Sequence, residues 1–90
     1  MARHISAMKR ARQNEKRRLR NQSRKTRVKK AVRLVRQAVG QKDLEAASAA
    51  LTQATPVIAQ VAAKGTLHWR TAARKISRLT RQVNALKAAE

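Results

Sequence analysis

The chain has 90 residues, enough for one domain, and its 23 Lys and Arg residues against 4 Asp and Glu give a formal charge of +19. The absence of Cys excludes disulfides, thiol nucleophiles and zinc knuckles. Trp69 is the only residue among Phe, Trp and Tyr, which excludes RNA recognition by the stacked aromatic residues of an RRM-type sheet.

A first helix is predicted over residues 7–39, where no Gly or Pro interrupts a run of good helix formers. Ser6 is the expected N-cap and Gly40 the expected left-handed C-cap. The C-terminal half carries an apolar face at steps of three and four residues, formed by Val28, Ala31, Val32, Val35, Ala38 and Val39. Over residues 7–27 this face stops, so we expect that part to extend beyond the rest of the fold.

A second helix is predicted over residues 44–63, with Asp43 as its N-cap and Lys64-Gly65 as its end. Pro56 falls on the solvent side, where we expect it to bend the helix without making a loop. The predicted inward face is Leu44, Ala47, Leu51, Ala54, Ile58, Val61 and Ala62.

A third helix is predicted over residues 67–87, with Thr66 as its N-cap. Its predicted inward residues are Trp69, Ala72, Ala73, Ile76, Leu79, Val83 and Leu86. Short connections between three amphipathic helices favour antiparallel neighbours. The predicted fold is therefore all-α: one domain over 1–90, a three-helix antiparallel bundle with a long, basic first helix extending beyond it.

Like charges repeat along the first helix. Residues 1–36 hold 15 of the 23 basic residues and one acid, Glu15. Lys16, Arg20 and Arg24 follow one another at repulsive four-residue steps, whereas an ordinary solvated helix surface mixes signs. We therefore predict a nucleic-acid-binding segment that is partly disordered in the free chain and helical among phosphates.

Further contacts are predicted from polar and cationic side chains elsewhere. Asn14, Asn21, Gln22, Ser23 and Thr26 add hydrogen-bonding groups to the basic helix. A stripe without acids on the third helix, predicted to contact phosphate, consists of Arg70, Arg74, Arg78 and Arg81. For His68, an RNA contact and a plain surface or capping role both stay open, and for Trp69 a core position is favoured over base stacking.

Catalysis and metal binding are not expected. Glu15, Asp43, Glu45 and Glu90 form no evident pair, and His4 and His68 lack acidic or sulfur companions. A membrane-active peptide is disfavoured because the basic segment has no apolar face, and no run approaches the roughly 20 apolar residues of a membrane span. RNA is favoured over a DNA-binding zipper, since Gly40 ends the helix after about three apolar turns, but a DNA-compacting basic protein stays an alternative.

Two stretches of sequence carry a family resemblance. The first comprises Ser6-Ala7, Lys9-Arg10, Gln13 to Arg18, Asn21, Ser23 and Arg24, and the second is AAKGTLHWRTAARK (62–75) followed by Leu79-Thr80. With these motifs the chain resembles, over essentially its whole length, the twentieth-protein family of the bacterial small ribosomal subunit. Met8 and Trp69 depart from the family pattern, which has basic or polar residues there.

The resemblance implies a structural protein that binds 16S rRNA directly, at the 5′ domain and the long penultimate helix, and helps the subunit assemble. It implies a cytoplasmic, ribosome-bound monomer beside other small-subunit components, with no enzymatic activity, cofactor, metal, membrane or small-molecule substrate. With the charge pattern, it gives the predicted RNA-binding set: Lys9, Arg10, Arg12, Gln13, Asn14, Lys16, Arg17, Arg18, Arg20, Asn21, Ser23, Arg24, Lys25, Arg27, Lys64, His68, Arg70, Arg74, Lys75 and Arg78.

Overall fold

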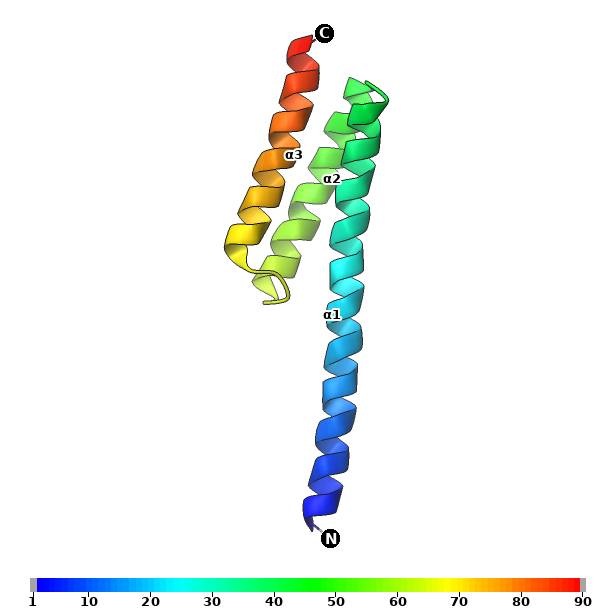
Figure 1. Ribbon diagram of the computed structural model, residues 1–90, viewed down its shortest axis with the longest axis vertical. Helices are drawn as coiled ribbons and strands as arrows, with labels where there is room; N and C mark the ends of the chain where they lie inside the picture. Colours follow the sequence, from blue (N-terminus) through cyan, green and yellow to red (C-terminus); the bar gives the residue numbers. More distant parts are fainter. Residues whose placement is uncertain (1, 90) are drawn as a thin grey trace.

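Three helices form the fold: α1 (Ala2–Gly40), α2 (Leu44–Ala63) and α3 (Trp69–Ala89). They run up, down and up, with α2 between its two neighbours (Figure 1). This computed structural model describes residues 2–89, with side chains from Ile5 to Ala89, so the side chains of His4 and Glu90 lie outside the described part. The predicted all-α bundle with a long first helix is confirmed.

The two ends of α1 differ from the sequence prediction. The helix already includes Ala2, so Ser6 lies inside it and is not its N-cap. Gly40 is still helical, and the left-handed residue is Lys42, with φ 57°. The Lys42 amide donates to the Val39 carbonyl at 3.0 Å and the Asp43 amide to the Ala38 carbonyl at 3.1 Å, the pattern of a Schellman motif. The helix therefore runs further than its glycine suggested.

The boundaries of α2 agree with the prediction. The Asp43 side chain accepts a hydrogen bond from the Ala46 amide at 3.1 Å, which makes Asp43 the N-cap. Lys64 is the C-cap and Gly65 follows with φ 81°, a conformation that suits glycine. Pro56 is exposed, as expected, and the helix continues through it without a loop.

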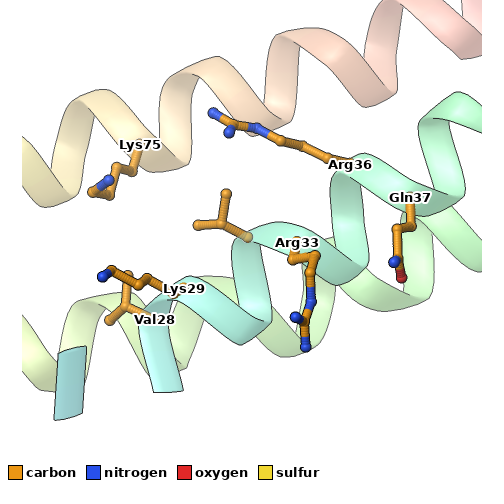
Figure 2. Close-up of a pocket in the computed structure, with 7 residues that line it drawn as sticks. Val28, Lys29, Arg33, Arg36, Gln37 and Lys75 are labelled. Carbon is orange, nitrogen blue, oxygen red and sulfur yellow. The ribbon is translucent and has the colours of Figure 1, made fainter. Parts of the chain in front are cut away.

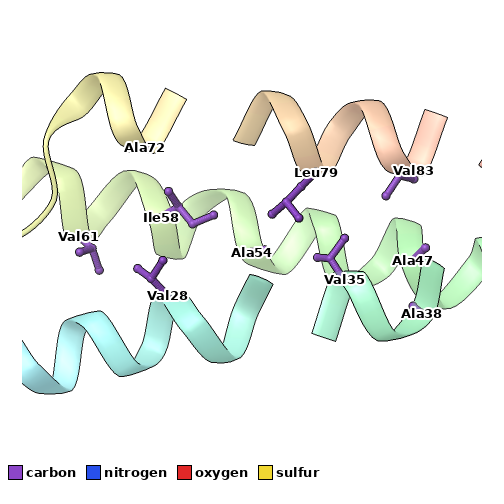
Figure 3. Close-up of a cluster of buried hydrophobic side chains, with 10 residues drawn as sticks. All are labelled: Val28, Val35, Ala38, Ala47, Ala54, Ile58, Val61, Ala72, Leu79 and Val83. Atoms are coloured by element: carbon purple, nitrogen blue, oxygen red, sulfur yellow. The ribbon is translucent and has the colours of Figure 1, made fainter. Parts of the chain in front are cut away.

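The core is aliphatic and runs along all three helices (Figure 3). Ile58, Leu79 and Val35 are its largest fully buried side chains. The predicted inward faces of α1 and α2 are confirmed, because each of their residues is buried or packs against the buried cluster. The full buried set is Val28, Val35, Ala38, Ala47, Ala54, Ile58, Val61, Ala72, Leu79 and Val83.

Two predicted core residues of α3 were wrong. Trp69 is 64 % exposed and Ala73 is exposed, although Ala72, Ile76, Leu79, Val83 and Leu86 do face the core. The reason lies in the preceding turn, where Leu67 packs against the core at the end of the bundle. Trp69, in the first turn of α3, lies outside this contact and is exposed.

The shape follows from the length of α1. At 1.5 Å per residue, its 39 residues make a rod of about 58 Å. The molecule measures 69 × 22 × 14 Å, and its radius of gyration is 18.0 Å against about 12 Å for a compact chain of this length. The N-terminal half of α1 therefore projects well past the other two helices (Figure 1).

The two glycines should respond to alanine in opposite directions. A Cβ at either position would meet no atom within 4 Å, so only backbone preference decides. Gly40→Ala should stabilise the fold by about 0.5–1 kcal/mol, because Gly40 is helical. Gly65→Ala should destabilise it by about 1–2 kcal/mol, because its φ is positive. Urea unfolding measures both, and a loss of stability in Gly40→Ala would contradict the helix end described above.

Candidate nucleic-acid interface

The first candidate surface is the cationic arm, residues 5–20 of α1, where every side chain is exposed. Even its large apolar side chains are 49–66 % exposed, namely Ile5, Met8 and Leu19. Its cations lie on all sides of the helix: Lys9, Arg10, Arg12, Lys16, Arg17, Arg18 and Arg20. Gln13, Lys16, Arg17 and Arg20 together line one shallow hollow on this surface. The arm thus presents cations and amides that no part of the described chain covers.

The arm has one acid, Glu15, and it pairs within the arm. The Arg18 guanidinium donates to the two Glu15 carboxylate oxygens at 2.7 and 3.1 Å. This hydrogen bonding, together with charge attraction, lowers the pKa of Glu15 and raises the pKa of Arg18. Because both side chains are more than half exposed, the pair contributes little to stability. The pair neutralises one of the seven cations of the arm, which leaves six without an acidic partner in the arm.

The arm is helical throughout its described length, since the helix is continuous from Ala2 to Gly40, and its partial disorder in the free chain stays a prediction. Helix formation is costly to nucleate but inexpensive to propagate, and the packed half of α1 supplies the nucleus. Arg, Lys, Gln and Ala, which dominate the arm, all propagate a helix well. Each like-charge pair opposes the helix by only a few tenths of a kcal/mol.

The arm meets the bundle at a polar junction formed by Asn21, Arg24 and Thr66. The Thr66 hydroxyl donates to Asn21 Oδ1 at 3.1 Å and accepts from Arg24 Nη1 at 3.3 Å. Asn21, Arg24 and Thr66 are all half-buried, so the bundle begins at Asn21 and not after Arg27 as the sequence indicated. Thr66 was expected to cap α3, but its hydroxyl is used in this junction instead.

A second surface is an open groove of about 440 Å³ between α1 and α3. In Figure 2, Arg36 of α1 reaches toward α3 and Lys75 of α3 points toward α1, with Lys29 nearby. Arg33 and Gln37 point the other way. Lys25, Lys29 and Lys75 also line a neighbouring hollow over Val28 and Leu67. Neither set of lining residues includes an acid. Three cations, Lys29, Arg36 and Lys75, therefore line a site that suits an anion.

Lys29, Arg33 and Arg36 were not in the predicted RNA-binding set, because the predicted RNA-binding extension of the first helix ended at residue 27. The apolar face does bury Val28 and Val35, but the cations between them point elsewhere. The spacing of Lys25, Lys29 and Arg36 places them on one side of a helix. The sequence therefore showed that these cations share one side of the helix. It did not show that α3 packs beside that side.

A third surface lies on the outer side of α3. Arg74, Arg78 and Arg81 line one shallow hollow together with Ala73 and Ser77, as the predicted stripe requires. The fourth member, Arg70, is different, because its guanidinium carbon lies 5.2 Å from the centre of the Trp69 ring. The stripe thus has three members free to contact phosphate and one that stacks on an aromatic ring.

His68 has a structural role that the sequence left open. Its Nδ1 accepts a hydrogen bond from the Arg70 amide at 3.1 Å, so this imidazole satisfies one of the free amides at the start of α3. The ring is exposed and lies beside Trp69, with 5.8 Å between the ring centres. Trp69 therefore belongs to this exposed group, and its predicted position in the core was wrong.

The remaining predicted residues are dispersed over the surface. Asn14, Ser23, Lys25, Arg27 and Lys64 are exposed. Thr26, expected to add a hydrogen bond to a ligand, instead donates its hydroxyl to the Gln22 carbonyl at 3.0 Å. Within the described side chains, no three His, Cys, Asp or Glu residues gather as a metal site would require. Of the helices in the described part of the chain, none is long and apolar enough to cross a membrane.

Fold and charge together define a class: small, basic, helical proteins whose surfaces are built to meet a polyanion. Within that class, the model of the family Ribosomal protein S20 matches residues 2–84. Small ribosomal subunit protein bS20 of Syntrophus aciditrophicus is 56 % identical over 94 % of this chain and 96 % of the relative. The bS20 of Nitratidesulfovibrio vulgaris strain Miyazaki F is 52 % identical over 97 % of this chain and the whole relative.

The chain therefore belongs to the ribosomal protein S20 family. It is a structural, non-enzymatic component of the small ribosomal subunit, with rRNA and ribosomal proteins as its partners. The family resemblance stated from the sequence is confirmed.

Removing the acid of the arm should strengthen polyanion binding. Glu15→Gln adds one positive charge and frees Arg18. The slope of log affinity against log salt concentration should therefore become steeper by about one. Arg18→Gln, the matched control, should act in the opposite direction. The salt concentration that elutes each protein from a heparin column measures the effect, and equal elution of the two variants would contradict it.

The same pair gives a pH dependence. Because the pKa of Glu15 is lowered in the folded arm, its pairing is complete above the ordinary carboxyl range and is lost as pH falls through the lowered value. The wild-type protein should then approach Glu15→Gln in its elution from heparin. A difference between the two that persists at acid pH would contradict this assignment.

Proposed function

We propose that the protein binds 16S rRNA directly and stabilises its folding by neutralising phosphates between RNA helices. The observation that carries the proposal is the cationic arm, with seven cations, one acid and every side chain exposed. A helix with cations on all sides can meet phosphates from several directions at once. Counterions released from the RNA then supply the binding free energy.

The bundle supports the proposal in a different way. The Asn21–Thr66–Arg24 junction attaches the arm to the turn between α2 and α3. The arm, the groove between α1 and α3 and the outer face of α3 thereby become parts of one rigid body. RNA segments bound to these three surfaces would be held at fixed relative positions, which is how a protein of this size stabilises a folded RNA. Recognition then rests on the shape of the RNA backbone, with few base contacts.

The salt dependence of binding tests phosphate neutralisation. With 6–10 phosphate contacts, affinity for 16S rRNA should fall roughly 10³–10⁵-fold between 50 and 200 mM salt. Replacing Lys16, Arg17 and Arg20 with Gln should reduce the salt slope by about three, and so should replacing Lys29, Arg36 and Lys75. Lys42→Gln, in the turn between α1 and α2, is the control and should leave the slope unchanged. A slope that no triple variant changes would refute the mechanism.

A footprint tests the RNA target. The family resemblance leads us to propose contacts with the 5′ domain and the long penultimate helix of 16S rRNA. Hydroxyl-radical cleavage with and without protein should show protection confined to these two regions. In competition, duplex DNA should displace the protein only at concentrations well above those of folded rRNA. Equal affinity for both nucleic acids would favour a DNA-compacting protein instead.

A further inference from the structure

We propose that Trp69 is a stacking site for one unpaired nucleobase of the bound RNA. This inference rests on the proposed RNA binding and adds a base contact to the phosphate contacts described above. It starts from the position of the only Trp in a chain without Phe or Tyr. The side chain is 64 % exposed, while Leu67 covers the neighbouring end of the core. Trp69 therefore contributes its ring to the surface and not to the bundle.

The ring belongs to an ordered group, the His68–Arg70 platform, formed by residues 68, 69 and 70. The His68 ring is held by the hydrogen bond from the Arg70 amide to its Nδ1, at 3.1 Å. Against it lies the Trp69 ring, with 5.8 Å between centres and 26° between planes. The Arg70 guanidinium carbon is 5.2 Å from the Trp69 ring centre. These contacts orient the ring in the free protein, and such preorganisation lowers the entropy cost of binding.

Trp69 remains 64 % exposed with these neighbours in place, so the side chain is accessible to another planar group. Every base has a flat π surface, and stacking one on an aromatic side chain is the usual way in which proteins bind unpaired nucleotides. A base within a duplex already stacks on both sides. The ligand is therefore a base in a bulge, loop or strand end.

The charge around the platform selects a nucleotide over an apolar partner. Arg70 lies over the ring, Lys64 and Arg74 are exposed within five residues of it along the chain, and residues 64–89 include no Asp or Glu. An apolar protein surface would leave these cations unpaired at its edge, whereas the phosphates on either side of a base would pair with them. Trp69 is moreover the one large exposed apolar side chain of α2 and α3, too little for an apolar interface.

The single Trp makes the proposal directly measurable, because all indole emission comes from this site. The probe is a transcript of the 16S rRNA 5′ domain, titrated into the wild-type protein. Stacking should quench Trp69 emission and protect it from acrylamide. Trp69→Leu should weaken binding by about 5- to 150-fold, the value of one stacked base, with the salt slope unchanged. Trp69→Phe, which keeps an aromatic ring, should lose much less.

Leu34→Ala removes another exposed apolar side chain and serves as the control, with circular dichroism to check the fold of each variant. Salt-dependent binding with unquenched emission and equal affinity of the Leu and Phe variants would overturn the stacking site and leave the proposed function intact. Emission that shifts to the blue without quenching would mean burial against an apolar partner and would also overturn it. No salt-dependent binding of the transcript would overturn both proposals.

Discussion

Repulsion among the cations of α1 is the constraint on which the structure depends. Along the arm, seven cations face one acid, and Glu15 neutralises only its neighbour Arg18. No other described element reaches the arm to supply an opposite charge, because α2 and α3 end beside the other half of α1 (Figure 1). The positive charge of the arm is therefore not neutralised within the described part of the protein. We propose that RNA phosphates supply the opposite charge, which agrees with membership of a ribosomal protein family.

The bundle itself folds around a core that contains no charged side chains, so all the cations of the described helices lie outside the core. Its ten buried residues are all Ala, Val, Ile or Leu, and no polar or charged side chain is buried in the described part of the chain. Such a thin core suffices because α2 packs against both of its neighbours, while α1 and α3 each turn one apolar side toward it. The other sides of α1 and α3 stay available for cations, so these two helices also present the groove and the outer face of α3.

Much of this could be predicted from the sequence. The steps of three and four residues located the core faces of α1 and α2, and Asp43 and Gly65 marked the ends of α2, because caps and helical periodicity are local properties. Errors arose where distant residues compete for one position. Leu67 occupies the end of the core and leaves Trp69 outside, and Asn21 engages the Thr66 hydroxyl that would otherwise cap α3. Such competition between residues for one position does not appear in the periodicity of the sequence.

The sequence by itself determined the fold class, the family and the excess of cations on the first helix, since all three follow from composition and local order. Tertiary structure alone decided which cations act together. Lys75 is 46 positions from Lys29 along the chain, yet packing of α3 beside α1 places both on one groove. It also decided that Asn21 and Arg24 belong to the bundle, because their partner Thr66 lies in a turn more than 40 residues away. Such proximity depends on how helices pack, and helix packing is set by shape and burial across the whole chain.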